Sequence, residues 1–263
     1  MKLPRLRWTP VRRPRHPDVV VVVAAVAAAG ALGFALRPQH TPIVAVAPAS
    51  AEIQRPALPQ TKLLTALVIS DSYTSGSGLP ETSYACRAVT EMGWLCQLAA
   101  EPGTGYISGG DANRFPLDQG RGQSSSFGER VTALSRYYSP DIVIFDGGRD
   151  DTFAPPVARF QVTVSAIWQA HQTWPKARIV FVKPRFLATP DDDLGVNDDI
   201  VDLLRQATEV KDLVVIDPII RFKDTDTKGL ISPDGTNPNR EGEEALAAAL
   251  VEEFSQNGMQ PAT

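Results

Sequence analysis

Short apolar runs alternate with longer segments of helical periodicity from residue 63 onward. The apolar runs cover residues 63–69, 95–99, 142–145, 178–182 and 213–216. The helical segments cover about 82–92, 125–138, 155–173, 197–211 and 239–255. Apolar runs of this length suit strands that are buried on both faces. The alternation therefore predicts an α/β fold in which helices cover both faces of a five-stranded parallel sheet.

A different pattern precedes this region. Residues 18–36 read DVVVVVAAVAAAGALGFAL, an apolar run close to the length that spans a bilayer. Residues 1–17 are basic, with no acid, which predicts a cytoplasmic N-terminus and a single-pass signal-anchor. The proline-rich residues 37–60 predict an extended spacer between this anchor and a main domain at 61–258.

A cleaved signal peptide is the alternative interpretation of the same segment. Ala49-Ser50-Ala51 fits the small-x-small cleavage pattern, although it lies well beyond the apolar run. Both interpretations place the main domain outside the cytoplasm. We expect the protein at the cell membrane, with the membrane as a partner through the N-terminal helix.

Cysteine content and charge agree with that compartment. Cys86 and Cys96 are the two cysteines of the chain, and an even number outside the cytoplasm favours a disulfide over two buried free thiols. No further Cys or His ligand lies near them in the sequence, so we expect no metal, and we expect no cofactor. The chain has a net charge of −4, because its basic N-terminal residues partly offset a more acidic main domain. An acidic main domain argues against nucleic acid as a partner.

Polar and glycine-rich blocks follow the predicted strands. They cover residues 69–76, 102–106, 147–151 and 232–239. In parallel sheets of this kind ligands bind at the carboxyl ends of the strands, where these blocks lie. Each block is weak alone, because a serine such as Ser72 after a strand is usually a helix cap or a turn residue.

In this order, the four blocks resemble those of the SGNH hydrolase family, also called GDSL esterases and lipases. The resemblance covers about residues 63–255 and implies a three-layer, flavodoxin-like fold. It implies that Ser72, in the block SDSYTSG, is the catalytic nucleophile. It also implies that Asp234 orients the base, at the position where the family has histidine and this chain has Asn237.

The resemblance also implies an oxyanion hole. One donor is the backbone N–H of Gly103, with Gly105 as the alternative. The family's block Gly-x-Asn-Asp supplies a second donor from its Asn, and here the block has Asp150 at that position, followed by Asp151. We expect the neighbouring Arg149 to pair with one of these two acids, although an anionic ligand is the alternative.

Two of the four functional positions thus depart from the family pattern. A serine hydroxyl is a poor nucleophile unless a base takes its proton, and the amide of Asn237 cannot accept a proton at neutral pH. The three histidines do not replace it, because His16 and His40 precede the main domain and His171 is predicted across the sheet from the blocks. An ionised Asp150 would repel an oxyanion where an amide would stabilise it.

The leading hypothesis is therefore a catalytically impaired, membrane-anchored SGNH-like protein that binds an acylated glycan, an acyl ester or another cell-envelope component. The alternative is an active serine ester hydrolase or acyl transferase, with Asp150 or Asp151 as the base for Ser72, or with a protonated Asp150 as the oxyanion donor. A third hypothesis is a scaffold that docks partner proteins through the anchor and spacer. The aromatic residues Tyr73, Tyr106 and Phe153 follow the blocks and either line a groove or pack in the core.

Overall fold

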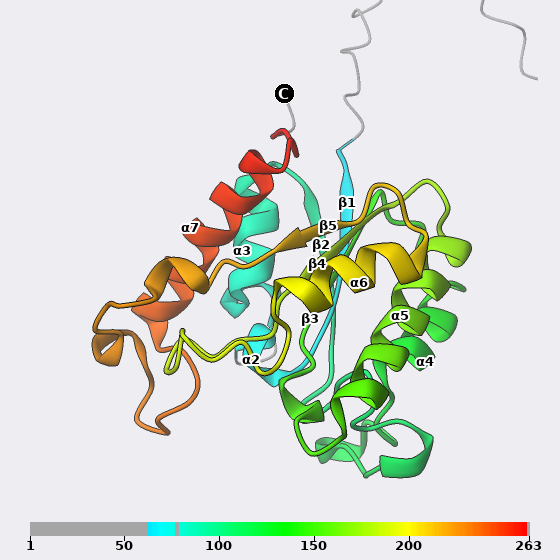
Figure 1. Ribbon diagram of the computed structural model, residues 1–263, viewed down its shortest axis with the longest axis horizontal. Coiled ribbons are helices and arrows are strands. Elements are labelled where there is room, and N and C mark those ends of the chain that lie inside the picture. Colours follow the sequence, from blue (N-terminus) through cyan, green and yellow to red (C-terminus); the bar gives the residue numbers. More distant parts are fainter. Residues whose placement is uncertain (1–62, 77–78, 262–263) are drawn as a thin grey trace, which may run out of the picture. The chain divides into compact units, whose positions relative to one another are not determined.

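A computed structural model describes residues 63–76 and 79–261 of the chain. Its five strands form one parallel sheet in the order β2-β1-β3-β4-β5 (Figure 1). The strands are β1 (Thr65–Ser70), β2 (Leu95–Ala100), β3 (Ile142–Asp146), β4 (Arg178–Val182) and β5 (Val214–Ile216). The predicted sheet is confirmed, and its strands begin and end within about two residues of the predicted bounds.

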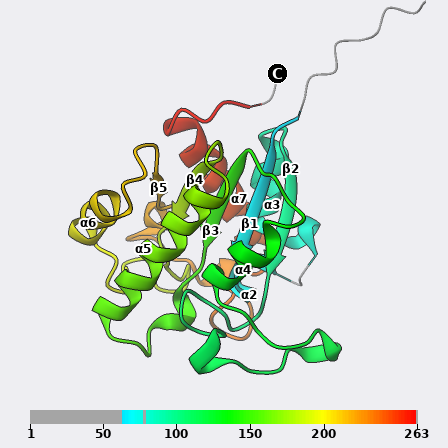
Figure 2. The same cartoon turned by 90° about the vertical axis from the view of Figure 1, so that its right-hand side faces the viewer.

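Helices cover both faces of the sheet, so the domain has three layers (Figures 1 and 2). Helices α3 (Tyr84–Glu91) and α7 (Arg240–Gln256) pack on one face. Helices α4 (Phe127–Leu134), α5 (Pro156–Thr173) and α6 (Asp198–Thr208) pack on the other. Side chains of β1 alternate between the two cores, because successive residues of a strand point to opposite faces.

All five predicted helices are present, although α4 ends earlier than predicted. Polar caps mark where several of them begin. Ser126 and Glu129 form a capping box at the start of α4, and Asn239 accepts a hydrogen bond from the backbone N–H of Gly242 at the start of α7. A sixth helix, α2 (Ser72–Ser75), was not predicted, because four residues are too few to show a helical period.

A disulfide joins Cys86 of α3 to Cys96 of β2. The two Cα atoms are 5.4 Å apart, and the residues are separated by 10 positions in the sequence. This confirms the predicted disulfide and excludes the alternative of two free thiols. The bridge ties the edge strand to the helix that precedes it.

The predicted tail (1–17), anchor (18–36) and spacer (37–60) lie outside the described residues, and they stay predictions. Among residues 63–76 and 79–261, no helix has the length and apolar character needed to cross a membrane.

Candidate active site

Ser72 is the first residue of α2 and follows the carboxyl end of β1, which lies between β2 and β3 in the sheet. Asp71 caps this short helix, since its Oδ1 accepts hydrogen bonds from the backbone N–H groups of Tyr73 (2.9 Å) and Thr74 (3.4 Å). Asp71, Tyr73 and Thr74 are buried, whereas Ser72 is exposed. The strand and the cap therefore present the serine at the surface.

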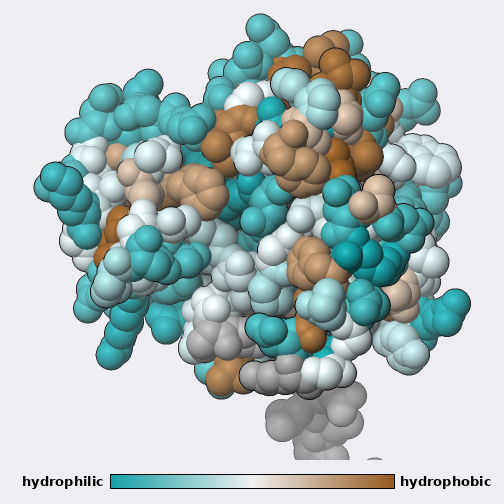
Figure 3. All heavy atoms as spheres, turned by 90° about the horizontal axis from the view of Figure 1, so that it is seen from below, coloured by the Kyte–Doolittle hydropathy of each residue, from teal (hydrophilic) through white to brown (hydrophobic). Residues whose placement is uncertain are grey.

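An open cavity of about 630 Å³ lies in front of Ser72. The structure brings Asp234 and Asn237 into its wall, although they are far from Ser72 in the sequence. Figure 3 views the molecule from below and shows a hollowed, largely hydrophilic surface at this edge of the sheet. The cavity is lined by Ser72, Tyr73, Gly76, Thr82, Arg87, Ser232, Asp234, Asn237, Pro238, Asn239, Arg240 and Glu243.

Asn237 is bound to Asp234 in two ways. Its side-chain Nδ2 donates to Asp234 Oδ2 at 2.8 Å, and its backbone N–H donates to Asp234 Oδ1 at 2.9 Å. The side-chain hydrogen bond, together with those from the backbone of Thr236 and Asn237, lowers the pKa of the Asp234 carboxyl below its usual value. Asp234 thus orients the side chain at position 237, but that side chain is an amide.

The hydroxyl of Ser72 has no hydrogen-bond partner among the described residues. Within residues 63–76 and 79–261, the only hydrogen bond to Ser72 outside the helix pattern is one that its carbonyl accepts from the Ser75 hydroxyl at 3.3 Å. Neither a carboxylate nor an imidazole lies within hydrogen-bonding distance of Ser72 Oγ in this part of the chain. His171 lines a different cavity, with the first residues of β4 and β5, at the opposite edge of the sheet, as predicted.

The expected oxyanion residues lie in the loops after β2 and β3. Gly103 has φ of 70°, which favours glycine, and its carbonyl accepts a hydrogen bond from the Ser108 hydroxyl at 2.7 Å. The N–H of Gly105 donates to the carbonyl of Ser108 at 3.0 Å, so this alternative donor is already used. Neither Gly103 nor Asp150 lines the Ser72 cavity.

The two consecutive acids after β3 differ in their surroundings. Asp150 is exposed, yet desolvation by the surrounding protein, and then the charge of Asp151, raise its pKa. Asp151 is buried and accepts three backbone hydrogen bonds, from Tyr106 (2.7 Å), Ile107 (3.1 Å) and Ser108 (2.8 Å). Asp151 therefore fastens the loop after β2 to the loop after β3, and its oxygens are not free to act on Ser72.

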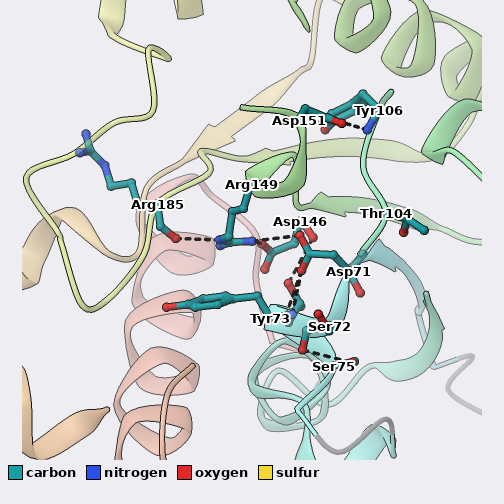
Figure 4. A network of polar contacts seen from close by, with 12 residues as sticks. Asp71, Ser72, Tyr73, Ser75, Thr104, Tyr106, Asp146, Arg149, Asp151 and Arg185 are labelled. Atoms are coloured by element: carbon teal, nitrogen blue, oxygen red, sulfur yellow. Dashed lines mark hydrogen bonds and ion pairs between the residues drawn. The ribbon is translucent and has the colours of Figure 1, made fainter. Parts of the chain in front are cut away.

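Arg149 pairs with other acids than expected (Figure 4). Its Nη1 donates to Asp146 Oδ1 at 3.1 Å and lies 3.8 Å from Asp71 Oδ2, and its Nε donates to the carbonyl of Arg185 at 2.7 Å. The expected pair with Asp150 or Asp151 is wrong. The buried guanidinium compensates two buried carboxylates at the ends of β1 and β3, a role that depends on strand pairing and not on nearness in sequence.

Of the three aromatic side chains near the blocks, Tyr73 lines the Ser72 cavity, Tyr106 packs in the core, and Phe153 is exposed. The guanidinium of Arg149 stacks over the ring of Tyr73, 4.2 Å from its centroid, and the Tyr73 hydroxyl accepts a hydrogen bond from the backbone N–H of Leu187. Tyr106 is buried against Phe127, with ring centroids 4.7 Å apart.

Glu243 is the residue of the cavity wall whose role the sequence did not indicate. It belongs to the first turn of α7, which predicted only a favourable helix-dipole interaction. Its Oε2 accepts a hydrogen bond from the backbone N–H of Tyr84 at 2.9 Å, and a Cβ placed on Gly76 would lie 3.4 Å from its Oε1. Burial raises the pKa of Glu243 from 4.5 to about 8. At neutral pH this carboxyl is therefore mainly protonated.

Asp71 has a similarly shifted pKa. Burial, assisted by the charges of Asp146 and Asp150 and opposed by Arg149, raises it from 3.8 to about 7. Its Oδ1 caps α2, and its Oδ2 is buried without a hydrogen bond in the described part of the chain. Asp71 thus stabilises the first turn of the helix that carries Ser72.

Solved structures with a similar fold include esterases of the SGNH or GDSL type, which confirms, at the level of the fold, the resemblance expected from the sequence blocks. No family model matches the chain, and no curated protein matches it.

Three of these structures illustrate the likeness. A family two carbohydrate esterase from Clostridium thermocellum, in complex with cellohexaose, is 16% identical with a TM-score of 0.55 over 74% of this chain and 65% of its own. One from Cellvibrio japonicus is 20% identical with a TM-score of 0.55 over 77% and 62%. The esterase EstA from Pseudoalteromonas sp., inhibited by monoethylphosphonate, is 14% identical with a TM-score of 0.53 over 73% and 97%. The chain thus spans less than two thirds of the length of these carbohydrate esterases.

Proposed function

We propose that this protein is a catalytically impaired SGNH-like binding module. Its ligand is an acylated glycan or another hydroxyl-rich component of the cell envelope, held in the Ser72 cavity. The predicted anchor at residues 18–36 would hold the module at the outer side of the cell membrane. The observation that carries the proposal is the hydrogen bond from the amide of Asn237 to Asp234, which fills the position of the base with a group that cannot take a proton.

The known cost in rate of losing a catalytic base or an oxyanion donor supports the proposal that catalysis is impaired. Loss of the catalytic histidine in a serine protease of unrelated fold costs on the order of 10⁶-fold in kcat. Loss of one oxyanion donor costs roughly 10²- to 10³-fold, and Asp150 stands where the family has such a donor. These effects are not additive, but the missing base alone is enough to prevent useful turnover.

The lining of the cavity supports a polar ligand. Ser72 supplies a hydroxyl, Asn237 a side-chain carbonyl oxygen, and Arg87 and Arg240 supply charged donors. The hydroxyls of Thr82 and Ser232 and the side-chain amide of Asn239 donate to backbone carbonyls of the protein itself. The first four of these side chains match the hydroxyls and carbonyls of an acylated sugar. The fold neighbours under 25% identity do not carry this assignment, although one of them is solved with cellohexaose.

A fluorophosphonate probe tests the missing base, because it labels only an activated serine. We expect no labelling of the full chain at neutral pH above that of Ser72→Ala. Labelling that Ser72→Ala abolishes would contradict impairment.

Ligand binding is tested separately. Acetylated cello-oligosaccharides should bind the full chain saturably, as followed by saturation-transfer NMR. Ser72→Trp should abolish this binding by filling the cavity, whereas Ser135→Trp, at an exposed serine after α4, should not. Equal binding to both variants would place the ligand elsewhere.

Glu243 favours a second candidate, an ester hydrolase that works at raised pH. This carboxyl shares the cavity with Ser72, and above its pKa of about 8 it becomes a carboxylate that can accept a proton. This function predicts fluorophosphonate labelling of Ser72 that increases from about pH 7 to about pH 9 and disappears in Glu243→Gln. Absence of labelling across this range leaves the binding module as the function.

A further inference from the structure

A second cavity, distinct from the Ser72 cavity, lies between α5 and α6 on the opposite face of the sheet from α7. These two helices lie side by side in Figure 2. The cavity measures about 230 Å³ and shares no lining residue with the Ser72 cavity. Its walls are mostly apolar, and they include Val157, Phe160, Phe181, Ile200, Leu203 and Leu204.

The apolar walls continue onto the surface. Phe181 and Leu204 are buried at the inner side of the cavity, whereas Val157 and Leu203 are 68% and 49% exposed. An apolar cavity of about 150 Å³ in another protein stays dry and binds benzene. A larger cavity of the same kind with an exposed apolar rim is suited to a hydrocarbon chain that enters from solvent.

One charged side chain, Arg159, lines this cavity. Its Nη1 donates to the carbonyl of Leu194 at 2.7 Å, and its Nε is buried without a hydrogen bond in the described part of the chain. No carboxylate among the described residues forms an ion pair with it. Arg159 therefore contributes a positive charge, and a donor without a hydrogen bond, to a wall whose other side chains are apolar except for Thr163.

Acids in the loops that precede α5 and α6 accept hydrogen bonds from backbone groups. Asp192 and Asp193 accept hydrogen bonds from the backbone N–H groups of Leu194 and Gly195, at 2.9 and 2.8 Å. Burial raises the pKa of Asp151, the charge of Arg159 opposes this rise, and the Asp151 carboxylate accepts hydrogen bonds from three backbone N–H groups. Among the described residues, no carboxylate thus forms a hydrogen bond with the Arg159 guanidinium.

We propose that the α5–α6 cavity binds a medium-chain fatty carboxylate, with its hydrocarbon chain among the apolar side chains and its carboxylate on the guanidinium of Arg159. Burial of the chain supplies a non-directional attraction. The charge-assisted hydrogen bond to the carboxylate supplies the preference for an acid over a neutral chain of the same length. This site is independent of the proposed role of the Ser72 cavity.

The test is a titration with sodium octanoate of the full chain held in lipid nanodiscs, with empty nanodiscs as the blank, read from the methyl NMR signals of Val157 and Leu203. We expect saturable shifts, and affinity at least about tenfold higher for octanoate than for octan-1-ol. Octyltrimethylammonium should bind no better than the alcohol. Equal affinity for octanoate and octan-1-ol, or shifts that grow linearly without saturation, would overturn the proposal.

Variants separate the two parts of the site. Leu203→Trp should fill the rim and weaken octanoate at least about tenfold, while Leu95→Trp, at a leucine of similar exposure on β2, should leave it unchanged. Arg159→Gln should reduce octanoate to the affinity of octan-1-ol without changing the latter, and Arg159→Lys should retain part of the preference. Wild-type affinity in Leu203→Trp would overturn the site. If Arg159→Gln does not fold by near-UV circular dichroism, the wild-type comparison of acid and alcohol decides.

Discussion

Replacement of Glu243 by glutamine should make the free energy of unfolding decrease less as the pH rises. Only 8% of Glu243 is exposed, and burial raises the pKa of its carboxyl from 4.5 to about 8. The folded protein therefore holds this proton more tightly than the unfolded chain does. Stability is greatest below the unfolded pKa and is lost as pH rises through the window between the two values.

The size of the effect follows from these two pKa values. Between about pH 5.5 and about pH 7.5, the deprotonation of Glu243 in the unfolded chain, but not in the folded one, lowers the free energy of unfolding by about 2.5 kcal/mol. Glutamine does not titrate, and its amide oxygen can still accept the hydrogen bond from the Tyr84 backbone. The loss of stability over this interval should therefore be about 2.5 kcal/mol smaller in Glu243→Gln than in the wild type.

Urea unfolding of the full chain at the two pH values, followed by near-UV circular dichroism, measures this difference. Asp71 has a pKa raised to about 7 and titrates with the same sign, so the variant should keep a residual decline. Glu244→Gln, at an exposed neighbour on the same helix, is the matched control for the loss of one acid. A decline in Glu243→Gln within about 0.5 kcal/mol of the wild-type decline would refute the assignment of a raised pKa to this carboxyl.

The result bears on function as well as stability. A protonated Glu243 in the wall of the Ser72 cavity can donate a hydrogen bond to a ligand at neutral pH but cannot act as a base. If its pKa is ordinary, the cavity holds a carboxylate at neutral pH. The ester-hydrolase alternative would then gain support.

Two further substitutions test the site and its support. Asn237→His should raise the rate of p-nitrophenyl acetate hydrolysis by about 10²-fold or more, because Asp234 can orient the imidazole. Adding Asp150→Asn should raise this rate further. No gain in the double variant would mean that the cavity lacks more than these two groups. Asp151→Ala should lower the free energy of unfolding by about 3 kcal/mol and expose the loop at 102–126 to proteolysis, since three backbone N–H groups lose their acceptor. Asp151→Asn should be milder in both assays, and a wild-type proteolysis pattern in Asp151→Ala would show that the loop is held by other contacts.

Much of the architecture is readable in the sequence because it rests on short-range patterns. Buried strands show as apolar runs, and helices show by their period and their polar caps. The blocks at the strand ends identify Ser72, Asp234 and Asn237, and the parallel sheet brings these residues to one cavity. The pair of cysteines predicts the bridge between α3 and β2, because an even number of cysteines in the predicted extracytoplasmic compartment favours a disulfide.

Tertiary structure alone decided which groups surround those residues. Arg149 binds Asp146 and Asp71, because the pairing of β1 with β3 brings their carboxyl ends together, whereas nearness in sequence suggested Asp150 or Asp151. Glu243 reaches the backbone of Tyr84 across 159 positions of the chain. A pKa depends on the burial and charges around a group, and these are set by contacts between distant segments. The sequence by itself thus pointed to Ser72, Asp234 and Asn237, and only the packed structure determined which other carboxyl shares their cavity and in which protonation state.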